Sequence, residues 1–560
     1  MFDRSETNRD ALLLALIATC ISVAALTYYY RQDAILLYGD AVAHINVARR
    51  VFDSRRPGPS QLGTVWLPIP HILMLPFIVW RWAWRTGLGG SIPSMVGYVA
   101  GVLGVFRLLR GGFASIGATT GRARLAAWFG ALVFAVNPNL IYMQATAMGE
   151  SLYLAFFVWA TVFLSEFVQH WREEDWRGAG HSLRWCGVML FCAMLSRYDG
   201  WFMAAFFGIT VLLIFALGGK QFPGQTIWQP QVRNGFAAFA FLIVLAPAFW
   251  LGWNQAYFEN ALEWLNGPYS AKAIMQRSMH RGDPPHPGYH DVKTAAVYYM
   301  KAAKLNLTGD NLGWGGARYG WPMRVERTWP VLALLGTALL LLVARSMWPL
   351  LLLWLPLPFY ALAIAYGGVP IFIPVWPPYS FYNVRYAMHL LPVVAVFVAI
   401  LLFLLSSLMR SRAFVVALTA VAVVFVGVSY GSIWKSGPVS LHEAQSNSPV
   451  RIGLERQVGA QLQSLPQSAE MLAQIGYYSG VYERAGIPLK RTINETDFRL
   501  WEAALSDPAR YVDYLVAADD DRVSQAASEH QAEFEAIAKF EAPGQPSVTV
   551  YRRKTIAGRE

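Results

Sequence analysis

The chain has 560 residues, of which 55% are hydrophobic and only 14% are charged. Soluble domains carry about 25% charged residues, so this composition excludes an ordinary water-facing enzyme. It also excludes a disordered chain and a disulfide-rich secreted fold, because apolar residues are abundant and the chain has three cysteines. The composition predicts a polytopic α-helical membrane protein.

Charge is distributed unevenly along the chain. The net charge of +11 divides into +15 over residues 1–439 and −4 over residues 440–560. This shift predicts a basic transmembrane domain over 1–435 and a small, mildly acidic domain over 440–560. The basic excess does not indicate nucleic acid as a partner, because no basic-aromatic module is evident and Lys and Arg also collect in cytoplasmic loops of membrane proteins.

The first apolar run, residues 11–27, is long enough to span a bilayer. It ends in Tyr28, Tyr29 and Tyr30, a residue type that suits the membrane interface. A cleaved signal peptide is the alternative, but no small-residue cleavage site follows the run. With this run, about eleven spans are predicted, the others being 91–108, 125–140, 150–168, 184–197, 200–217, 235–253, 329–345, 347–366, 386–405 and 413–432.

One further apolar run, residues 64–84, is interrupted by Pro68, Pro70 and Pro76. Proline removes a helical hydrogen bond, and Trp alternates with Arg at the end of the run. This pattern favours an interfacial or re-entrant segment over a clean span.

The short loops predict the orientation, because Lys and Arg concentrate on the cytoplasmic side. If the N-terminus is inside and 64–84 does not span, the turns 138–149 and 367–383 are outside and contain no Lys or Arg. The inner loops then carry Arg107, Arg110, Arg122, Arg124, Arg172, Arg177, Arg184, Lys220, Arg233, Arg345, Arg410 and Arg412. The outer face is expected to hold the loop 31–63, the long loop 255–327 and the C-terminal domain.

The C-terminal domain is predicted to be a small extracytoplasmic α/β unit. A helix is expected over 451–463, and strands over Met471–Ile475, Tyr511–Ala517 and Ser547–Tyr551. The domain has no Gly-rich phosphate-binding fingerprint, which favours a packing or acceptor-docking role over a second active site.

Asp40 follows the first span and precedes a stretch, Ala41 to Phe52, whose apolar residues recur at helical spacing. The spacing predicts an amphipathic helix at the outer interface, with His44 on its polar side. A carboxylate where water meets lipid is placed to act as a general base on a lipid-borne substrate. The alternative is a helix N-cap, a common role for Asp before a helix.

Glu150 stands at the head of the span 150–168, where the helix dipole favours a negative charge. One interpretation is again a helix cap. The other is a functional carboxylate, since ionisable residues at membrane borders are candidates for function and Glu150 is expected on the same face as Asp40.

An Arg-Tyr pair occurs twice on the expected outer face, at Arg197-Tyr198 and at Arg385-Tyr386. Arginine binds phosphate through a fixed fork of donors, so the two arginines are candidates to neutralise a lipid phosphate or diphosphate. The alternatives are headgroup anchoring for either arginine and, for Arg197, a salt bridge to Asp199.

No metal site is predicted. The candidate ligands in the loop 255–327 are His280, Asp283, His286, His290 and Asp291. Neighbouring prolines make this segment extended, and its spacing matches no metal motif. Cys20, Cys186 and Cys192 lie in apolar stretches and are interpreted as small buried hydrophobic residues.

The order of these motifs resembles that of the GT-C superfamily of polytopic glycosyltransferases. The motifs are Asp40 with its interfacial helix, Asn137-Pro138, Glu150, Ser196-Arg197-Tyr198-Asp199-Gly200, Arg385-Tyr386 and Leu391-Pro392. The chain is most similar to the branch of protein O-mannosyltransferases and lipid A aminoarabinose transferases. Leu62 to Pro68, followed by His71, also looks like that branch.

The resemblance implies a GT-C enzyme that takes a sugar from a polyprenyl-phosphate donor and transfers it, with inversion, on the outer face. It assigns the general base to Asp40 and the second acidic position to Glu150. The residues expected to bind substrate are Arg385, Arg197, Tyr386, His44 and His71.

The chain also departs from its relatives. Ala41 stands where protein O-mannosyltransferases have a second acid, and Ala147 to Glu150 lack the acid-x-acid pair of oligosaccharyltransferases. N-glycan transfer and a required divalent metal are therefore disfavoured, and no cofactor is expected. The expected partners are a lipid-linked sugar donor, a glycan, lipid or protein acceptor, and the bilayer of a bacterial plasma (inner) membrane.

Two other functions stay open from the residues alone. One is a transporter or flippase of a lipid-linked substrate, and the other is a non-catalytic GT-C relative. A transporter more often has repeat symmetry or charges near the middle of the membrane. The unusual charges here gather at one face, which favours the transferase.

Overall fold

The computed structural model describes residues 4–218, 229–278, 285–309, 321–476 and 478–554. The α-helices are α1 (Arg4–Arg31), α2 (Gly39–Arg50), α3 (Pro68–Ile78), α4 (Arg81–Arg85), α5 (Leu88–Ser115), α6 (Gly121–Ala135), α7 (Pro138–Gln144), α8 (Glu150–Arg172), α9 (Trp176–Met194), α10 (Asp199–Gly218), α11 (Pro230–Phe258), α12 (Glu263–Asn266), α13 (Ala271–Ser278), α14 (Val292–Leu305), α15 (Trp321–Val343), α16 (Pro356–Tyr366), α17 (Leu391–Leu408), α18 (Arg412–Ser436), α19 (Val439–Asn447), α20 (Pro449–Gln463), α21 (Ser479–Ala485), α22 (Arg499–Ser506), α23 (Pro508–Tyr511) and α24 (Arg522–Glu529). The 3₁₀ helices are η1 (Pro59–Leu62), η2 (Arg345–Trp354), η3 (Val384–Leu390), η4 (Leu489–Arg491) and η5 (Glu495–Asp497), and the strands are β1 (Met471–Ala473), β2 (Thr492–Ile493), β3 (Tyr514–Ala518), β4 (Phe534–Ala542) and β5 (Gln545–Arg553).

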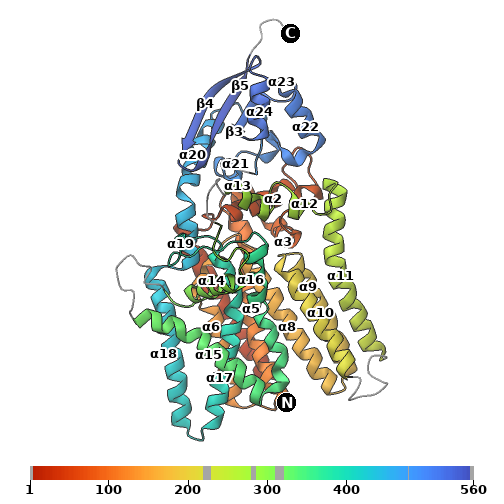
Figure 1. Ribbon diagram of the computed structural model, residues 1–560, viewed down its shortest axis with the longest axis vertical. Helices are drawn as coiled ribbons and strands as arrows, with labels where there is room; N and C mark the ends of the chain where they lie inside the picture. Colours follow the sequence, from red (N-terminus) through yellow and green to blue (C-terminus); the bar gives the residue numbers. More distant parts are fainter. Residues whose placement is uncertain (1–3, 219–228, 279–284, 310–320, 477, 555–560) are drawn as a thin grey trace.

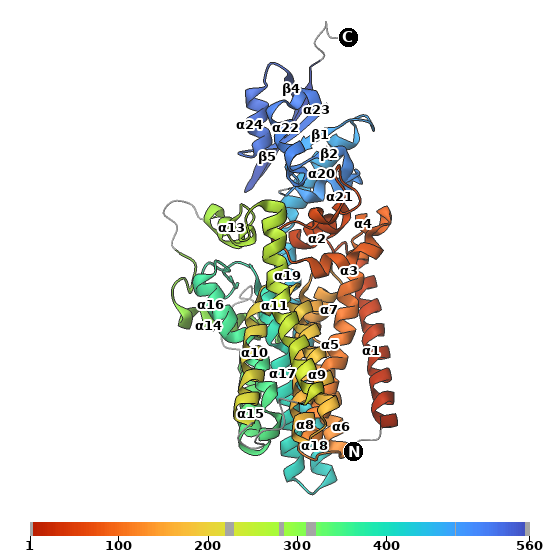
Figure 2. The same ribbon diagram turned by 90° about the vertical axis from the view of Figure 1, so that its right-hand side faces the viewer.

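The long helices run side by side in one bundle, and the sheet caps one end of it (Figures 1 and 2). We call this end the sheet end; α1 begins at the opposite end. Helices α8 and α17 form the centre, with 78% and 89% of their most apolar stretches buried, against 22% for α1 and α11 at the periphery. The predicted polytopic helical membrane fold with a small C-terminal α/β unit is therefore confirmed.

Eight helical stretches of the described residues are long and apolar enough to span a membrane, or nine if the bent pair α6 and α7 counts as one span. Eleven spans were predicted. When nine are counted, two of the predicted spans are missing. The segment 184–197 belongs to α9, whose first half is polar, and the segment 329–345 belongs to α15, whose described apolar part is too short. The predicted span 347–366 combines the 3₁₀ helix η2 with α16.

A close approach between α5 and α8 fixes the start of α8. A Cβ atom on Gly97 would lie 2.8 Å from the backbone N and Cα of Leu152, so only glycine allows this contact without movement. Because Glu150 begins the same turn of α8, the contact places this residue at the sheet end of the bundle.

The proline-rich run 64–84 folds into two short helices, α3 and α4, packed against each other and against α5. Helix α3 has 11 residues, too few to cross a bilayer. Trp80 and Trp82 are 64% and 63% exposed, as expected for side chains that face lipid or its headgroups.

Helix α2 differs from the amphipathic interfacial helix that the spacing predicts. It packs against α3, η1 and α21, so its polar residues His44, Asn46 and Arg50 are buried along with its apolar ones. The side-chain amide of Asn46 donates to the carbonyl of Ser479, and its side-chain oxygen accepts from the indole of Trp84. The C-terminal unit thus covers α2 at Asn46, whereas α3 covers His44.

The C-terminal unit contains a five-stranded sheet in the order β2-β1-β3-β5-β4. Strands β2, β1 and β3 are parallel, and β5 is antiparallel to both β3 and β4. Helix α20, the predicted 451–463 helix, connects the unit to α19 and packs against β4 and α21.

The three predicted strands correspond to β1, β3 and β5, with ends shifted by up to three residues. The sequence analysis missed β2 and β4. Strand β2 has two residues, too few for an alternation to be visible. Strand β4 alternates Ala and Phe with Glu and Lys, and no residue between Phe534 and Ala542 is fully buried, so its strand pattern is weak.

Glu483 makes the stability of the C-terminal unit depend on pH. Burial raises the pKa of its carboxyl group to about 8, with Arg484 opposing the shift. Between about pH 4.5 and about pH 8 the folded state keeps a proton that the unfolded state releases, so the free energy of unfolding falls as pH rises through this window.

Glu483→Gln should remove this dependence, because glutamine resembles the protonated acid in shape and carries no charge. Its stability advantage over the wild type is expected to be near zero at about pH 5 and to grow by roughly 1 kcal/mol per pH unit up to about pH 8. Thermal unfolding across this range measures it, with Glu529→Gln, on the exposed end of α24, as control. Equal pH profiles for the wild type and Glu483→Gln would contradict the assignment.

Candidate active site

The candidate site lies at the sheet end, where the N-termini of α2 and α8 meet η3 and α19. Its centre is the guanidinium group of Arg385, which contacts three carboxylates. Nη2 donates to Asp40 Oδ2 at 2.6 Å, Nε to Glu150 Oε1 at 3.2 Å and Nη1 to Glu443 Oε1 at 2.7 Å. The site therefore joins four segments that are far apart in the sequence.

Glu443 binds the backbone at the start of η3 as well as the guanidinium group of Arg385. Its carboxylate also accepts from the backbone N–H groups of Asn383, at 2.7 Å, and Arg385, at 3.2 Å. The Tyr38 hydroxyl oxygen lies 3.3 Å from it and donates its proton to the carbonyl of Ser440. Since the Glu443 side chain is 2% exposed, this carboxylate is a fixed anchor for Arg385.

A second arginine stands on the other side of Glu150. Arg197 Nη1 donates to the same Glu150 Oε1 atom, at 3.4 Å, and its Nε lies 3.3 Å from Asp199 Oδ1. The Arg197–Asp199 salt bridge, which was the alternative role for Arg197, is therefore present, together with the contact to Glu150. The two guanidinium groups contact the same carboxylate oxygen. Two guanidinium groups this close together are also suited to bind an anionic group of a substrate.

Arg197 also belongs to a buried polar network. Its Nη2 donates to the Tyr360 hydroxyl at 3.2 Å, and that hydroxyl donates to Asp199 Oδ2 at 3.0 Å. His389 Nδ1 lies 3.0 Å from both the hydroxyl and the carboxylate. The network fixes the position of Arg197 beside Glu150.

The carboxylates differ in exposure. The Asp40 side chain is 42% exposed, whereas those of Glu150 and Glu443 are 1% and 2% exposed. Asp40 is therefore the carboxylate of the Arg385 cluster that a substrate reaches first. The second oxygen of Glu150 is buried and has no hydrogen-bond partner among the described residues, so its capacity to accept a hydrogen bond is unused.

The helix-cap alternatives for both acids are wrong. Helix α2 has Tyr38 at its N-cap and α8 has Gly149, and neither helix has a side-chain cap. Asp40 and Glu150 lie in the first turns, where the helix dipole favours them, and direct their carboxylates at Arg385.

The Tyr386 ring contacts both arginines. The guanidinium carbons of Arg385 and Arg197 lie 4.8 and 4.6 Å from its ring centre, at cation–π distance. Its ring also stacks on that of Tyr360. Tyr386 thus packs against both positive charges.

His44 lies one helical turn after Asp40 on α2 and forms a pair with His71 of α3, with 2.8 Å between Nδ1 and Nε2. The His44 ring also packs against Trp66, with 4.8 Å between ring centres. Burial lowers the pKa of His44, and the carboxylates of Asp40 and Glu150 oppose this shift. His44 borders the site directly, whereas His71 contacts it through His44.

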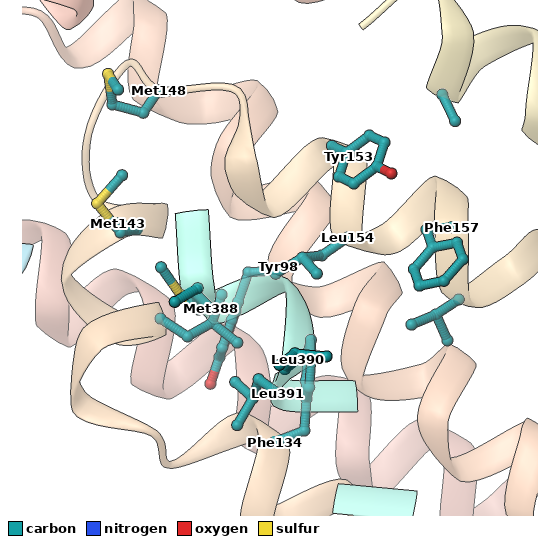
Figure 3. Packing of buried hydrophobic residues seen from close by; sticks show 14 of the residues in the cluster. Tyr98, Phe134, Met143, Met148, Tyr153, Leu154, Phe157, Met388, Leu390 and Leu391 are labelled. Carbon is teal, nitrogen blue, oxygen red and sulfur yellow. The ribbon is translucent and has the colours of Figure 1, made fainter. Parts of the chain in front are cut away.

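Buried apolar side chains pack these segments against one another. Figure 3 shows Leu154 of α8 and Met388 of η3 near Tyr98 of α5, with Met143 and Met148 further away on the segment before α8; all five belong to one buried cluster. The hydroxyl of Tyr98 donates to the carbonyl of Ala135. The helix bearing Glu150 and the segment bearing Arg385 therefore share one core.

Only some of the loop residues considered as metal ligands are described by the structure. His280 and Asp283 lie outside the described residues. Asp291 caps α14 by accepting from the backbone N–H groups of Lys293 and Thr294. No group of three His, Cys, Asp or Glu side chains that could hold a metal ion occurs in the described ranges.

The sequence analysis missed Glu443, Tyr360 and His389. Glu443 follows the last predicted span and was counted with the C-terminal domain; its place next to a span was the available signal. His389 lies within the predicted span 386–405, where an ionisable residue is itself a signal of function. Tyr360 sits in an apolar run and gave no signal.

The whole chain is similar in structure to ArnT from Cupriavidus metallidurans. The TM-score is 0.52, at 12% identity, to ArnT bound to undecaprenyl phosphate and 0.51, at 11% identity, to the apo state. Each alignment covers 98% of this chain and 99% of ArnT. An oligosaccharyltransferase from Archaeoglobus fulgidus aligns at a TM-score of 0.47 and 13% identity, over 96% of this chain and 72% of its own.

No protein-family model and no curated protein sequence matches the chain. The similarity to ArnT, which is a GT-C lipid A aminoarabinose transferase, extends over the membrane bundle and the C-terminal unit together. The chain therefore has the GT-C membrane fold.

Proposed function

We propose that this protein is a membrane glycosyltransferase that moves a sugar from a polyprenyl-phosphate donor to an acceptor hydroxyl group. The observation that carries the proposal is the half-exposed carboxylate of Asp40 beside the Arg385–Arg197 pair, at one end of a GT-C bundle. The ArnT structure with undecaprenyl phosphate supports a lipid phosphate as the group that such a site receives.

The proposed reaction is a single displacement at C1 of the donor sugar. The acceptor oxygen attacks C1 from the face opposite the phosphate, and Asp40 takes the acceptor proton. The bond from C1 to the phosphate oxygen breaks, and the leaving polyprenyl phosphate keeps the electron pair. The sugar is thereby transferred with inversion at C1.

The arginines stabilise the charge that develops on the leaving phosphate. Arg385 and Arg197 are positioned before the reaction by Glu443 and by the Asp199 network, so little reorganisation is needed when the charge appears. A donor phosphate that binds Arg385 also competes with Asp40 for the guanidinium edge, which frees the carboxylate to accept a proton.

We assign the remaining groups to substrate orientation. Glu150, with one unpartnered oxygen, accepts a hydrogen bond from a hydroxyl group of the donor or the acceptor. His44, supported by His71, borders the same space from α2, and Tyr386 packs against both arginines. These groups supply a base and positive charge, so we propose a reaction without a nucleotide or a divalent metal.

We place the sheet end on the outer face of a bacterial plasma (inner) membrane, with the N-terminus in the cytoplasm. The short-loop arginines support this orientation: Arg107, Arg124 and Arg172 pair at the far end of the bundle, with Glu166, with Glu6 and Asp10, and with the Ser346 carbonyl, respectively. The acceptor is then a glycan, lipid or protein that reaches the outer face.

A panel of polyprenyl-phosphate sugars tests the proposal. The purified protein, reconstituted in liposomes with one donor at a time, is expected to release polyprenyl phosphate and to form a glycosylated product from an extract of cell-envelope acceptors. Transfer of intact donor between the two leaflets, with no release of polyprenyl phosphate from any donor, would instead establish a transporter.

A further inference from the structure

The segment just before Asp40 is held from the C-terminal unit through its backbone. The carbonyl of Leu37 accepts from Arg451 Nη2 at 2.8 Å, and the carbonyl of Leu36 accepts from Arg484 Nη2 at 3.5 Å. Both arginines belong to the C-terminal unit, on α20 and α21. The residues that end the loop before α2 are thus fixed by groups more than 400 residues further along the chain.

One buried carboxylate organises the two arginines. Glu455 Oε1 accepts from Arg451 Nη1 at 2.7 Å, and Oε2 accepts from Arg484 Nε at 2.9 Å. The Glu455 side chain is 2% exposed. Each guanidinium group therefore has one edge on Glu455 and another on a backbone carbonyl, which fixes its direction more firmly than a single contact does.

Two glycines lie against this cluster. A Cβ atom on Gly480 would lie 2.3 Å from Glu455 Oε1, so a larger residue here would displace the carboxylate. On the other side, the position of a Cβ on Gly39 is 3.7 Å from Arg451 Nε. Arg451 therefore lies directly against the residue that precedes Asp40.

Tyr38 holds the same segment from α19. Its hydroxyl donates to the carbonyl of Ser440 at 2.6 Å, and its ring centre lies 4.9 Å from the guanidinium carbon of Arg385. The segment 36–39 is thus fixed on three sides before the chain turns into α2. This explains how a half-exposed Asp40 carboxylate stays within 2.6 Å of Arg385.

We propose that the C-terminal unit is a part of the active site: the Glu455–Arg451–Arg484 cluster positions Asp40 by holding the backbone at residues 36 and 37. The three members are positioning residues, because none of them contacts the carboxylate of Asp40. This role rests on the proposed function for its effect on turnover, and it has a structural consequence that needs no activity.

The test compares two single-charge changes on one helix in the full-length reconstituted protein. Arg451→Gln removes the contact to the Leu37 carbonyl, and Arg456→Gln removes a neighbouring exposed arginine. Hydrogen exchange of the backbone amides of residues 36–43 is expected to be about tenfold faster in Arg451→Gln and unchanged in Arg456→Gln. Equal exchange in the two variants would overturn the proposal.

Turnover gives the second measurement. Arg451→Gln is expected to lower kcat about tenfold, because a misplaced base slows the chemical step. KM for the donor is expected to change by less than about threefold, because Arg385 and Arg197 stay in place. Faster exchange with unchanged kcat would also overturn the proposal. If the wild type itself transfers no sugar, the proposed function is refuted. The exchange comparison still tests whether Arg451 holds the backbone before Asp40.

Arg451→Lys guards against a general loss of folding. Lysine keeps the ion pair with Glu455 but lacks the planar fork that reaches both partners. It is expected to keep the thermal unfolding temperature of the wild type and still to show faster exchange at residues 36–43. Wild-type exchange in Arg451→Lys would contradict the positioning role.

Discussion

Asp40→Asn is expected to lower the rate of sugar transfer by about a thousandfold, the range in which general-base groups act. Asparagine has almost the same shape as aspartate but does not accept the acceptor proton. Its side-chain oxygen still accepts from Arg385, so the arginine pair stays in place. The fold is expected to tolerate the change, because the side chain is 42% exposed. The measurement is kcat of the purified variant with a saturating donor.

Asp33→Asn is the matched control. Asp33 lies between α1 and α2, is exposed, and has a φ of 52°, a left-handed conformation that Asn also adopts readily. It is expected to transfer at the wild-type rate. An Asp40→Asn enzyme that stays within about threefold of the wild-type rate would refute the assignment of Asp40 as the base.

Arg385→Gln is expected to damage both the fold and donor binding. It leaves the buried carboxylates of Glu150 and Glu443 without their strongest partner, and breaking a buried pair in this way costs about 3–5 kcal/mol. Donor affinity falls as well, because one of the two guanidinium groups is lost. Thermal unfolding and binding of undecaprenyl phosphate measure the two effects separately.

Arg385→Lys separates the two effects further. Lysine retains the charge, so the folded protein is expected to survive, but one ammonium group does not contact three carboxylates and a phosphate as a guanidinium does. The control is Arg107→Lys, which changes the pair with Glu166 at the far end of the bundle and is expected to leave binding unchanged. Wild-type affinity for undecaprenyl phosphate in Arg385→Gln would contradict the assigned role.

Much of the membrane bundle could be predicted from the sequence, because an apolar run of sufficient length has few alternatives to a spanning helix. The distinction of residues 64–84 from a span rested on three prolines, and the structure has two short helices there. The strands β2 and β4 were not predictable in the same way. Their stability comes from pairing with neighbours distant in sequence, not from their own pattern.

Part of the site could be predicted, because few charged residues occur near the outer ends of the spans. Those expected on one face include the four that meet in the structure: Asp40, Glu150, Arg197 and Arg385. The contribution of Glu443 did not follow. It depends on α19 continuing from α18 and bending over η3, a path that local sequence does not specify. The cluster around Glu455 is similar, because it joins two helices of the C-terminal unit to the loop before α2.

The proposed chemistry assigns Asp40 the role of base and not of nucleophile, and the two roles leave different products. A carboxylate that takes the acceptor proton gives a single displacement and inversion at C1, whereas one that attacks C1 itself forms a sugar–enzyme ester and gives retention. The most direct test is the anomeric configuration of the first product formed from a donor of known configuration. We predict the inverted anomer; the retained anomer would contradict the account.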